Sequence, residues 1–357
     1  MRRALALAAH GLYTTTPNPR VGCVIVRDGT VVGEGWHRRA GEPHAEALAL
    51  AQAGERSRGA TVYVTLEPCS HFGRTPPCAD ALAAAGAARV IAAMEDPNPL
   101  VAGRGLQRLR DAGLDVRCGL LAVEAADLNV GFVCRMTRAR PWLRMKVAAS
   151  LDGRTALPTG ASQWITGEAA RADGHVWRAR ACALLTGIGT VRDDDPQLTV
   201  RGVGTPRQPV RVLVDSRLEV DLDARMLRGG AIVAAAAANP DKQAELRDRG
   251  CEVLHLPDAR GKVDLAALLA ELARRGINEL HVEAGWRLNG SLMRAGLVDE
   301  LLVYLAPKIV GDGAGMFDIG TLASLDEARR WAIEDIERVG QDVRLRLRVP
   351  RAGAAAT

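Results

Sequence analysis

The segment between His44 and Cys78 constrains this chain most. It contains His44-Ala45-Glu46, then Pro68-Cys69, and then Cys78. One imidazole and two thiolates form a common ligand set for a catalytic zinc ion, which keeps a fourth position open for water. Zinc lowers the pKa of bound water to near neutrality, and the Glu46 carboxylate, which is not needed as a ligand, can transfer protons. The pattern therefore predicts a catalytic metal site.

The spacing of the two cysteines is unusual for such a site. Zinc-dependent base deaminases share the order H-x-E and P-C, but usually place only two residues between the cysteines. Here eight residues separate Cys69 from Cys78. The geometry can accommodate them if residues 70–77 form an outward loop and Cys78 begins a helix over the apolar run 79–85. The alternative is two buried free cysteines and a surface histidine, but the complete pattern favours a metal site.

The first part of the chain alternates apolar runs of strand and helix length. An Asp28-Gly29 turn joins two predicted strands as an antiparallel hairpin. Predicted strands cover residues 21–26, 31–36, 61–66 and 89–94, and predicted helices cover an amphipathic opening segment, a segment starting at His44, and residues 103–112. His44 and Glu46 then lie in the first turn of one helix and Cys69 follows a central strand, so that the site forms where strands end and helices begin.

A domain boundary is predicted near residues 137–141, where Thr-Arg-Ala-Arg-Pro separates two ordered segments. A chain of 357 residues is too long for one ordinary hydrophobic core. We therefore expect one domain at residues 1–138 and a second α/β domain at residues 142–350. In the second domain the predicted strands cover residues 142–147, 183–185, 210–215, 231–236, 279–283 and 300–306, and the predicted helices cover residues 168–181, 265–275 and 288–295.

Charge and cysteine content narrow the possible functions. The net charge of +5 comes from 47 basic and 42 acidic residues that are interspersed, so no basic run indicates nucleic-acid binding. Seven irregularly spaced cysteines do not suggest a disulfide framework, which favours a reducing, cytoplasmic location. No apolar run reaches the roughly 18 residues of a membrane-spanning helix. A small phosphorylated substrate is compatible with all of these features.

Four segments of the first domain resemble a known family. They are residues 17–26 (PNPRVGCVIV), 41–46 (GEPHAE), 65–78 (TLEPCSHFGRTPPC) and 96–105 (DPNPLVAGRG). They closely resemble the bifunctional deaminase/reductases of riboflavin biosynthesis, in which the same long segment separates the cysteines. The resemblance covers nearly the whole chain. It implies a cytidine-deaminase-like α/β/α domain followed by a dihydrofolate-reductase-like α/β domain.

The resemblance implies roles for the residues of the metal pattern. His44, Cys69 and Cys78 would hold zinc, and Glu46 would act as the general acid and base. The implied reaction replaces the 2-amino group of 2,5-diamino-6-(5-phosphoribosylamino)pyrimidin-4-one with oxygen and releases ammonia. The residues that would contact this substrate are Asn18, His71 and Asn98.

Three of these first-domain assignments have alternatives. Asn18 stands between two prolines and could form an Asx turn. On spacing alone, His71 could be a zinc ligand, although the histidine of the H-x-E pattern fits that role better. Arg74 could contact the substrate phosphate or be an ordinary exposed loop residue.

The second domain carries the resemblance in residues 146–155, 160–166, 187–201 and 282–285. No G-x-G-x-x-G pattern follows its first strand, so a Rossmann fold is not supported. The resemblance implies NADPH as cofactor and hydride transfer to C1′ of the ribosyl group, which becomes ribityl in 5-amino-6-(5-phosphoribitylamino)uracil. Residues implied at NADPH are Ala148, Trp164, Thr190, Asp194, Ser216 and Gly285. Residues implied at the substrate are Ser162, Arg178, Leu198, Arg201 and Glu283. Lys146 is a candidate proton or hydrogen-bond donor beside the ribose.

Several second-domain features also allow simpler interpretations. Gly187-Ile188-Gly189 could be a plain turn, Asp194 could cap a turn, and Leu198 could be a packing residue. Trp286-Arg287 departs from the small or polar residues common in the family, which makes a phosphate contact from this stretch less certain. The glycine-rich segment 311–315 looks like a mobile turn without an assigned function.

Two other classes of protein compete with this interpretation. One is a cytidine or nucleic-acid deaminase with an extra domain, which the cysteine spacing and the lack of a basic groove with aromatic residues disfavour. The other is a non-catalytic, zinc-stabilised module, which Glu46 argues against because structural zinc sites usually have four protein ligands. We expect a phosphorylated pyrimidine substrate, no nucleic-acid or membrane partner, and a homo-oligomer, either a dimer or a tetramer.

Overall fold

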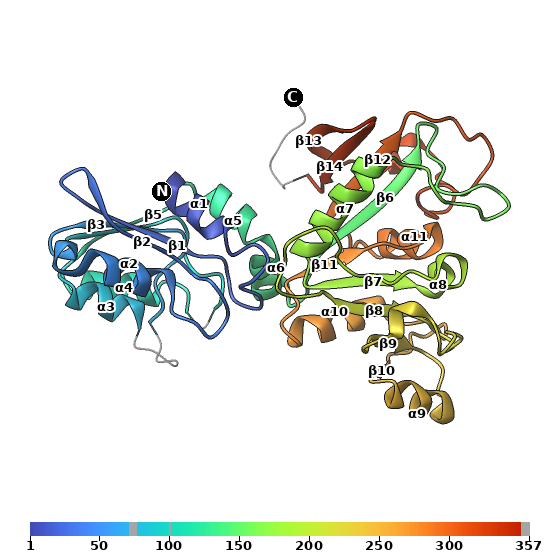
Figure 1. Cartoon of the computed structure of the whole chain (residues 1–357), viewed down its shortest axis with the longest axis horizontal. Helices are drawn as coiled ribbons and strands as arrows, with labels where there is room; N and C mark the ends of the chain where they lie inside the picture. Colours follow the sequence, from blue (N-terminus) through green and yellow to red (C-terminus); the bar gives the residue numbers. More distant parts are fainter. Residues whose placement is uncertain (71–76, 100, 351–357) are drawn as a thin grey trace. The chain divides into compact units, whose positions relative to one another are not determined.

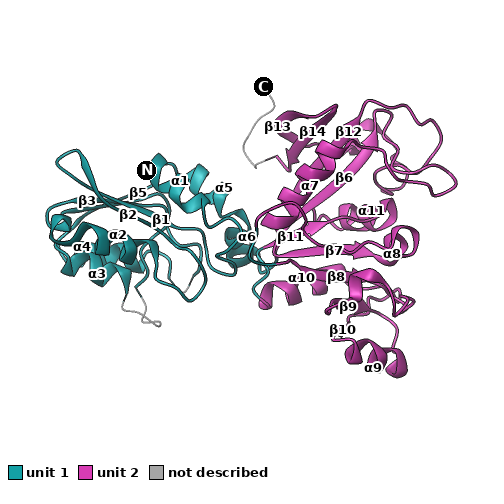
Figure 2. Cartoon of the chain, in the orientation of Figure 1, with its two compact units in different colours: residues 1–140, 205–207, 276–278 teal, residues 141–204, 208–275, 279–357 magenta. Residues whose placement is uncertain are grey.

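The chain forms two compact units in the computed structural model, which describes residues 1–70, 77–99 and 101–350. Unit 1, teal in Figure 2, contains residues 1–140 together with residues 205–207 and 276–278. Unit 2, magenta in Figure 2, contains the remaining residues of the chain from Pro141 onwards. No helix among the described residues is both long and apolar enough to cross a membrane.

Unit 1 is built on a five-stranded sheet with the order β2-β1-β3-β4-β5. Its strands are β1 (Gly22–Arg27), β2 (Thr30–Trp36), β3 (Thr61–Val64), β4 (Arg89–Ala92) and β5 (Asp115–Cys118). Its helices are α1 (Arg2–Ala9), α2 (Ala45–Ala53), α3 (Cys78–Ala84), α4 (Arg104–Asp111), α5 (Ala122–Leu128) and α6 (Val130–Arg138), with the 3-10 turn η1 (Gly54–Ser57). β1 is antiparallel to both β2 and β3, whereas β3, β4 and β5 run parallel. Helices α2, α3 and α4 cover one face, and α1 and α5 lie together on the other (Figure 1).

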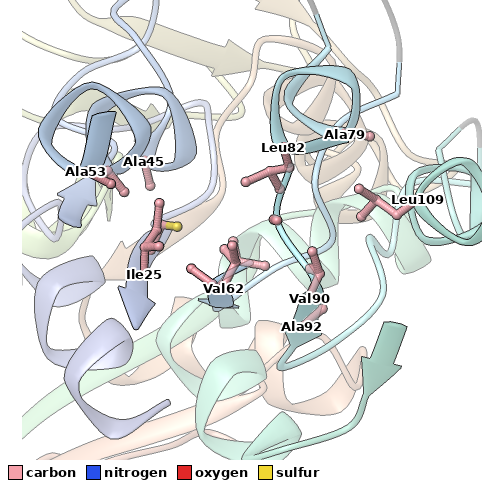
Figure 3. Close-up of a cluster of buried hydrophobic side chains, with 14 of the residues drawn as sticks. Ile25, Ala45, Ala53, Val62, Ala79, Leu82, Val90, Ala92 and Leu109 are labelled. Carbon is pink, nitrogen blue, oxygen red and sulfur yellow. The ribbon is translucent and has the colours of Figure 1, made fainter. Parts of the chain in front are cut away.

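Small residues bring α2 unusually close to the sheet. A Cβ atom on Gly33 would lie 2.2 Å from the carbonyl oxygen of Ala49, and one on Gly35 would lie 2.4 Å from that of Ala45. Such contacts are impossible for any residue with a side chain, so β2 accepts the helix only through glycine. Ala45 and Ala53 then enter the buried core shown in Figure 3. This packing holds the start of α2, where His44 and Glu46 lie.

Unit 2 is built on a nine-stranded sheet with the order β10-β9-β8-β7-β11-β6-β12-β14-β13. Its strands are β6 (Trp142–Ser150), β7 (Ala183–Gly187), β8 (Val210–Val214), β9 (Ile232–Ala235), β10 (Glu252–His255), β11 (Glu279–Val282), β12 (Glu300–Ala306), β13 (Ala332–Val339) and β14 (Asp342–Arg348). Its helices are α7 (Glu168–Arg180), α8 (Ile188–Asp194), α9 (Pro240–Asp248), α10 (Leu265–Arg274) and α11 (Trp286–Arg294), with the 3-10 turns η2 (Arg225–Leu227) and η3 (Leu325–Glu327). The strands are parallel except for the β13–β14 hairpin, which continues the sheet beyond β12 in antiparallel pairing.

A row of alternating charges crosses the middle of this sheet. Arg144 on β6 is 1% exposed and forms ion pairs with Glu279 on β11, at 3.1 Å, and with Glu300 on β12, at 2.5 Å. Glu300 also pairs with Arg348 on β14 at 3.0 Å. A buried charge is costly unless it is paired. The row therefore favours one alignment of these four strands over any slipped alternative.

The structure corrects several expectations about secondary structure. His44 is the N-cap of α2 rather than a residue of its first turn. Gly187 to Asp194 is not a plain turn, because β7 leads directly into helix α8. The sequence analysis did not predict eight further elements, which are β5, β10, β13, β14, α5, α6, α8 and α9. β14 carries the alternating sequence Val-Arg-Leu-Arg-Leu-Arg, which is a strand pattern of period two. Two arginines of this strand form ion pairs within unit 2, Arg344 with Asp173 and Arg348 with Glu300.

Candidate functional sites

His44, Cys69 and Cys78 form a three-ligand cluster in unit 1. The Nδ1 atom of His44 lies 3.3 Å from the Cys78 sulfur and 3.6 Å from the Cys69 sulfur, and all three ligand atoms lie within 4.8 Å of one another. In a tetrahedral site with bonds of about 2.0 Å to nitrogen and about 2.3 Å to sulfur, these atoms would be about 3.5 Å apart. The donor set and the separations therefore fit zinc. This is the one such cluster among the described residues.

Three different elements bring the ligands together. His44 caps α2, Cys69 follows β3, and Cys78 is the first residue of α3, as the apolar run 79–85 predicts. The backbone N–H of Cys78 points to the Cys69 sulfur at 3.3 Å. A hydrogen bond with the Cys78 thiol lowers the pKa of the Cys69 thiol to about 4, burial opposes this effect, and His44 and the Cys78 N–H add to it. A lowered pKa favours the thiolate, which is the form that binds metals.

Glu46 lies beside the cluster without being part of it. Its side chain is 3% exposed, and its Oε2 atom is buried with no hydrogen-bond partner among the described residues. Burial raises the pKa of Glu46 to about 7. A carboxyl group with such a pKa can both accept and release a proton near neutrality. This Oε2 atom is therefore available to hydrogen-bond a bound ligand, such as water or substrate.

Asn18 is held beside the cluster by a histidine that the sequence analysis did not single out. The Asn18 amide nitrogen lies 3.1 Å from Nε2 of His37, and Nδ1 of His37 lies 3.2 Å from the carbonyl oxygen of Pro43. The rings of His37 and His44 meet edge to face at 5.4 Å. The side chain of Asn18 therefore has a tertiary partner, and the proposed Asx turn is not needed to explain it. The one sequence signal for His37 is its place in Gly35-Trp36-His37, a few residues before the segment 41–46 that contains His44.

The other substrate residues expected in unit 1 have different outcomes. Asn98 lies in the loop between β4 and α4, and its N–H donates to the Asp96 carboxylate at 2.8 Å. That loop is tied to Glu67, two residues before Cys69. His71 and Arg74 lie outside the described residues.

Unit 2 contains an open cleft of about 1710 Å³ beside the carboxyl ends of its central strands. Ligand sites of α/β sheets commonly lie at that edge. All twelve residues expected at the reductase site line this one cleft. They are Lys146, Ala148, Ser162, Trp164, Arg178, Thr190, Asp194, Leu198, Arg201, Ser216, Glu283 and Gly285. The segments 313–315 and Trp286-Arg287 line it as well.

Charged groups gather at one part of the cleft. Arg178 binds Glu283 through two parallel hydrogen bonds of 2.5 and 2.8 Å. Burial alone would raise the pKa of Glu283, but Arg178 holds it well below its usual range. Burial lowers the pKa of the half-buried Lys146, against the opposing charge of Glu283. Burial and the charges of Arg178 and Arg201 also lower the pKa of the nearby His175, to about 4. The positive potential of this part suits an anionic group such as a phosphate.

Around α8 and the start of α11, hydrogen bonds connect several residues of the lining that are expected at the cofactor. The Gly285 N–H donates to the Thr190 hydroxyl at 3.1 Å, just before the start of α11. Asp194, the last residue of α8, accepts hydrogen bonds from Ser162 and Gln163, both at 3.1 Å. It therefore does more than cap a turn. The start of α11 offers backbone N–H groups to a phosphate.

The segment 311–315 is fastened to the loop that follows β6. The Asp152 carboxylate accepts from the N–H groups of Val310 at 3.1 Å and Gly311 at 2.8 Å, and Ala156 pairs with Ala314 as an isolated β-bridge. Expected only as a mobile turn, this segment instead forms a hydrogen-bonded wall of the cleft. Leu198 is 2% exposed and belongs to a hydrophobic cluster, as its packing interpretation predicts, although it also lines the cleft.

Two family models match the chain. One describes the RibD C-terminal domain and matches residues 141–345. The other describes the zinc-binding region of cytidine and deoxycytidylate deaminases and matches residues 1–94. The first covers more than half of the chain, and the second includes all three ligands of the cluster.

Individual relatives match over the full length. The riboflavin biosynthesis protein RibD of Escherichia coli is 49% identical over 360 residues, which cover 97% of this chain and 98% of that protein. A structure of Acinetobacter baumannii RibD has a TM-score of 0.91 at 44% identity and covers 98% of both chains. A Thermotoga maritima structure, described as a diaminohydroxyphosphoribosylaminopyrimidine deaminase/5-amino-6-(5-phosphoribosylamino)uracil reductase, has a TM-score of 0.87 at 33% identity and covers 98% of this chain and 97% of that one.

Proposed function

This chain belongs to the RibD family of bifunctional riboflavin-biosynthesis proteins, and we propose that residues 1–138 carry its deaminase and residues 142–350 its reductase. The enzyme deaminates 2,5-diamino-6-(5-phosphoribosylamino)pyrimidin-4-one and then reduces the ribosyl group to ribityl. Zinc supplies Lewis-acid activation of water in the first reaction, and NADPH supplies the hydride in the second. The observation that carries the first assignment is the zinc-type cluster with the free oxygen of Glu46 beside it.

In the deaminase, His44, Cys69 and Cys78 would hold the metal. Glu46 would take a proton from water as its oxygen adds to C2 of the ring, and would then pass a proton to the departing amine, so that ammonia leaves. The raised pKa of Glu46 supports both transfers. Asn18, His71 and Asn98 would bind the substrate, with Asn18 oriented by His37.

In the reductase, the part of the cleft around Arg178 and Arg201 would bind the substrate. The lining around α8 and the start of α11 would bind NADPH. Arg178, Arg201, Ser162, Leu198 and Glu283 would contact the substrate. The residues that would contact NADPH are Ala148, Trp164, Thr190, Asp194, Ser216 and Gly285. Lys146 would give a proton to the ribose ring oxygen as C1′ receives hydride. Its lowered pKa supports this role, because a weaker hold on the proton makes a better acid.

Replacing Lys146 with glutamine is expected to lower the reductase kcat about a hundredfold, since general acids contribute at least that much. In the parent enzyme the reductase rate should fall as the pH rises through the pKa of Lys146, which lies below 10.5. This alkaline decline should disappear in Lys146→Gln. NADPH oxidation with the deaminated intermediate, measured across pH, checks both points. Lys242→Gln on α9 is the matched control, because Lys242 does not line the cleft. An unchanged rate in Lys146→Gln would reject the role.

We further propose that the chain forms a homo-oligomer through the β13–β14 hairpin. Ile333 is 58% exposed and Ile336 is 62% exposed, and they pair across the strands with Leu347 and Leu345. An apolar stripe on an edge strand favours pairing with a second copy. Light scattering should show a dimer or tetramer that Ile336→Asp dissociates, and a monomeric parent protein would contradict the proposal. We propose a reducing, cytoplasmic location, because no disulfide joins any of the seven cysteines, all of which lie among the described residues.

A further inference from the structure

Glu67 is a buried carboxylate to which neither reaction assigns a role. It is 4% exposed and stands two residues before the zinc ligand Cys69. Its two oxygens accept hydrogen bonds from four backbone N–H groups. The donors are Asp96 at 3.0 Å and Gly103 at 2.9 Å on Oε2, and Gly105 at 2.7 Å and Leu106 at 3.3 Å on Oε1. One side chain therefore holds both ends of the loop between β4 and α4.

The start of α4 explains why a carboxylate is needed there. The first N–H groups of a helix have no partner within the helix. The N-cap of α4 is Gly103, which has no side chain to offer, so Glu67 caps the helix from a distant part of the chain. Its negative charge also suits the helix N-terminus. A Cβ atom on Gly105 would lie 1.9 Å from the carbonyl oxygen of Pro68, so that only glycine allows this approach.

The loop that Glu67 holds carries Asn98. The carbonyl oxygen of Asn98 accepts from the N–H groups of Val101 at 2.8 Å and Ala102 at 2.9 Å, and the Asn98 N–H donates to Asp96. Helix α4 is fastened on the other side of Cys69 as well, because Arg108 donates to the Ser70 carbonyl at 3.3 Å. The segment that carries Cys69 and the loop that carries Asn98 are thus both linked to helix α4.

We propose that Glu67 is a positioning residue of the deaminase: its carboxylate holds Asp96 and residues 103–106 so that Asn98 reaches the substrate beside the metal site. This inference rests on the substrate contact proposed for Asn98. Glu67 is not among the metal ligands and its carboxylate accepts from backbone N–H groups, so we expect it to act by positioning the substrate contact of Asn98. Losing such a contact raises KM while leaving kcat largely intact.

The test compares Glu67→Gln with Glu95→Gln and Asn98→Ala. Glutamine keeps the size of Glu67, but its NH2 group faces two of the four N–H donors and cannot accept from them. Glu95 is an exposed residue of the same loop and receives the same chemical change. Glu67→Asp keeps the charge and shortens its reach, and it gives a second variant should the glutamine protein not fold. Measurements are deaminase KM and kcat, zinc content, and hydrogen exchange of residues 96–106.

Glu67→Gln is expected to raise KM on the order of tenfold, the same effect that we expect of Asn98→Ala, because small misplacements of a contact are costly. Exchange of the Asp96, Gly103, Gly105 and Leu106 amides should accelerate, zinc content should stay at the parent level, and Glu95→Gln should resemble the parent. An unchanged KM despite faster exchange would overturn the inference, and so would loss of zinc, which would mean that Glu67 supports Cys69 instead. If Asn98→Ala leaves KM unchanged, the substrate contact proposed for Asn98 is wrong, and the positioning role of Glu67 fails with it. Faster exchange in Glu67→Gln would then still show that Glu67 holds the four backbone N–H groups.

Discussion

Glu46→Gln is expected to lower the deaminase kcat by on the order of 10³ to 10⁴, because glutamine fills the same space but can neither accept nor release a proton. Ammonia release from the diaminopyrimidinone substrate measures this effect. Zinc content should stay at the parent level, since the metal is held by His44, Cys69 and Cys78. The reductase should be unaffected when it is supplied with the deaminated intermediate.

Two control variants separate proton transfer from other causes. Glu42→Gln makes the same change at an exposed position four residues away and should keep full activity. Cys78→Ser should lose zinc together with ammonia release, because the site would lack one of its three ligands. A Glu46→Gln enzyme that releases ammonia at close to the parent rate would remove Glu46 from the chemistry. It would also revive the interpretation of unit 1 as a non-catalytic zinc module.

Arg144→Met is expected to destabilise unit 2 by about 3–5 kcal/mol, the usual cost of removing one partner from a buried ion pair. The substitution takes away a cation that lies between Glu279 and Glu300, both nearly inaccessible to solvent. Arg180 still pairs with Glu279 at 2.7 Å and Arg348 with Glu300 at 3.0 Å, but the cation that joins the two carboxylates is lost.

Urea unfolding followed by tryptophan fluorescence measures this loss. Five of the six tryptophans belong to unit 2, and Arg144 lies over the ring of one of them, Trp177, at 4.6 Å. Arg275→Met is the matched control, since its ion pair with Glu252 is partly exposed and should contribute no more than about 1 kcal/mol. If Arg144→Met and Arg275→Met unfold at the same urea concentration, the charge row does not stabilise the sheet.

The metal ligands could be predicted from sequence because their identity is local. His44 and Cys69 stand in short motifs, Cys78 precedes an apolar run, and each of the three adjoins a strand or helix whose apolar pattern is clear. The α/β rule that sites form where strands end and helices begin then places them together. These two observations are enough to predict that the three ligands lie close together in the structure. The reductase residues, in contrast, were expected only through family resemblance, because no local pattern among them indicates a cofactor.

The supporting residues could not be predicted, because their partners are chosen by the tertiary fold. Glu67 receives donors that are 29 to 39 residues away in sequence. His37 acquires its role from Asn18 and from the Pro43 carbonyl. The Arg144 row depends on strand alignment, and alignment is not visible in the separate segments. In β14, apolar residues alternate with arginines, two of which pair with distant carboxylates: Arg344 with Asp173 and Arg348 with Glu300.

The most direct test of the whole account supplies the purified, zinc-loaded enzyme with 2,5-diamino-6-(5-phosphoribosylamino)pyrimidin-4-one and NADPH and follows ammonia and NADPH absorbance together. The account predicts that ammonia appears first and that NADPH is then consumed in equal amount, because the reductase acts on the deaminated product. Ammonia without NADPH oxidation would contradict the roles proposed for the unit 2 cleft. Neither signal from protein that retains zinc would contradict the assignment of both activities.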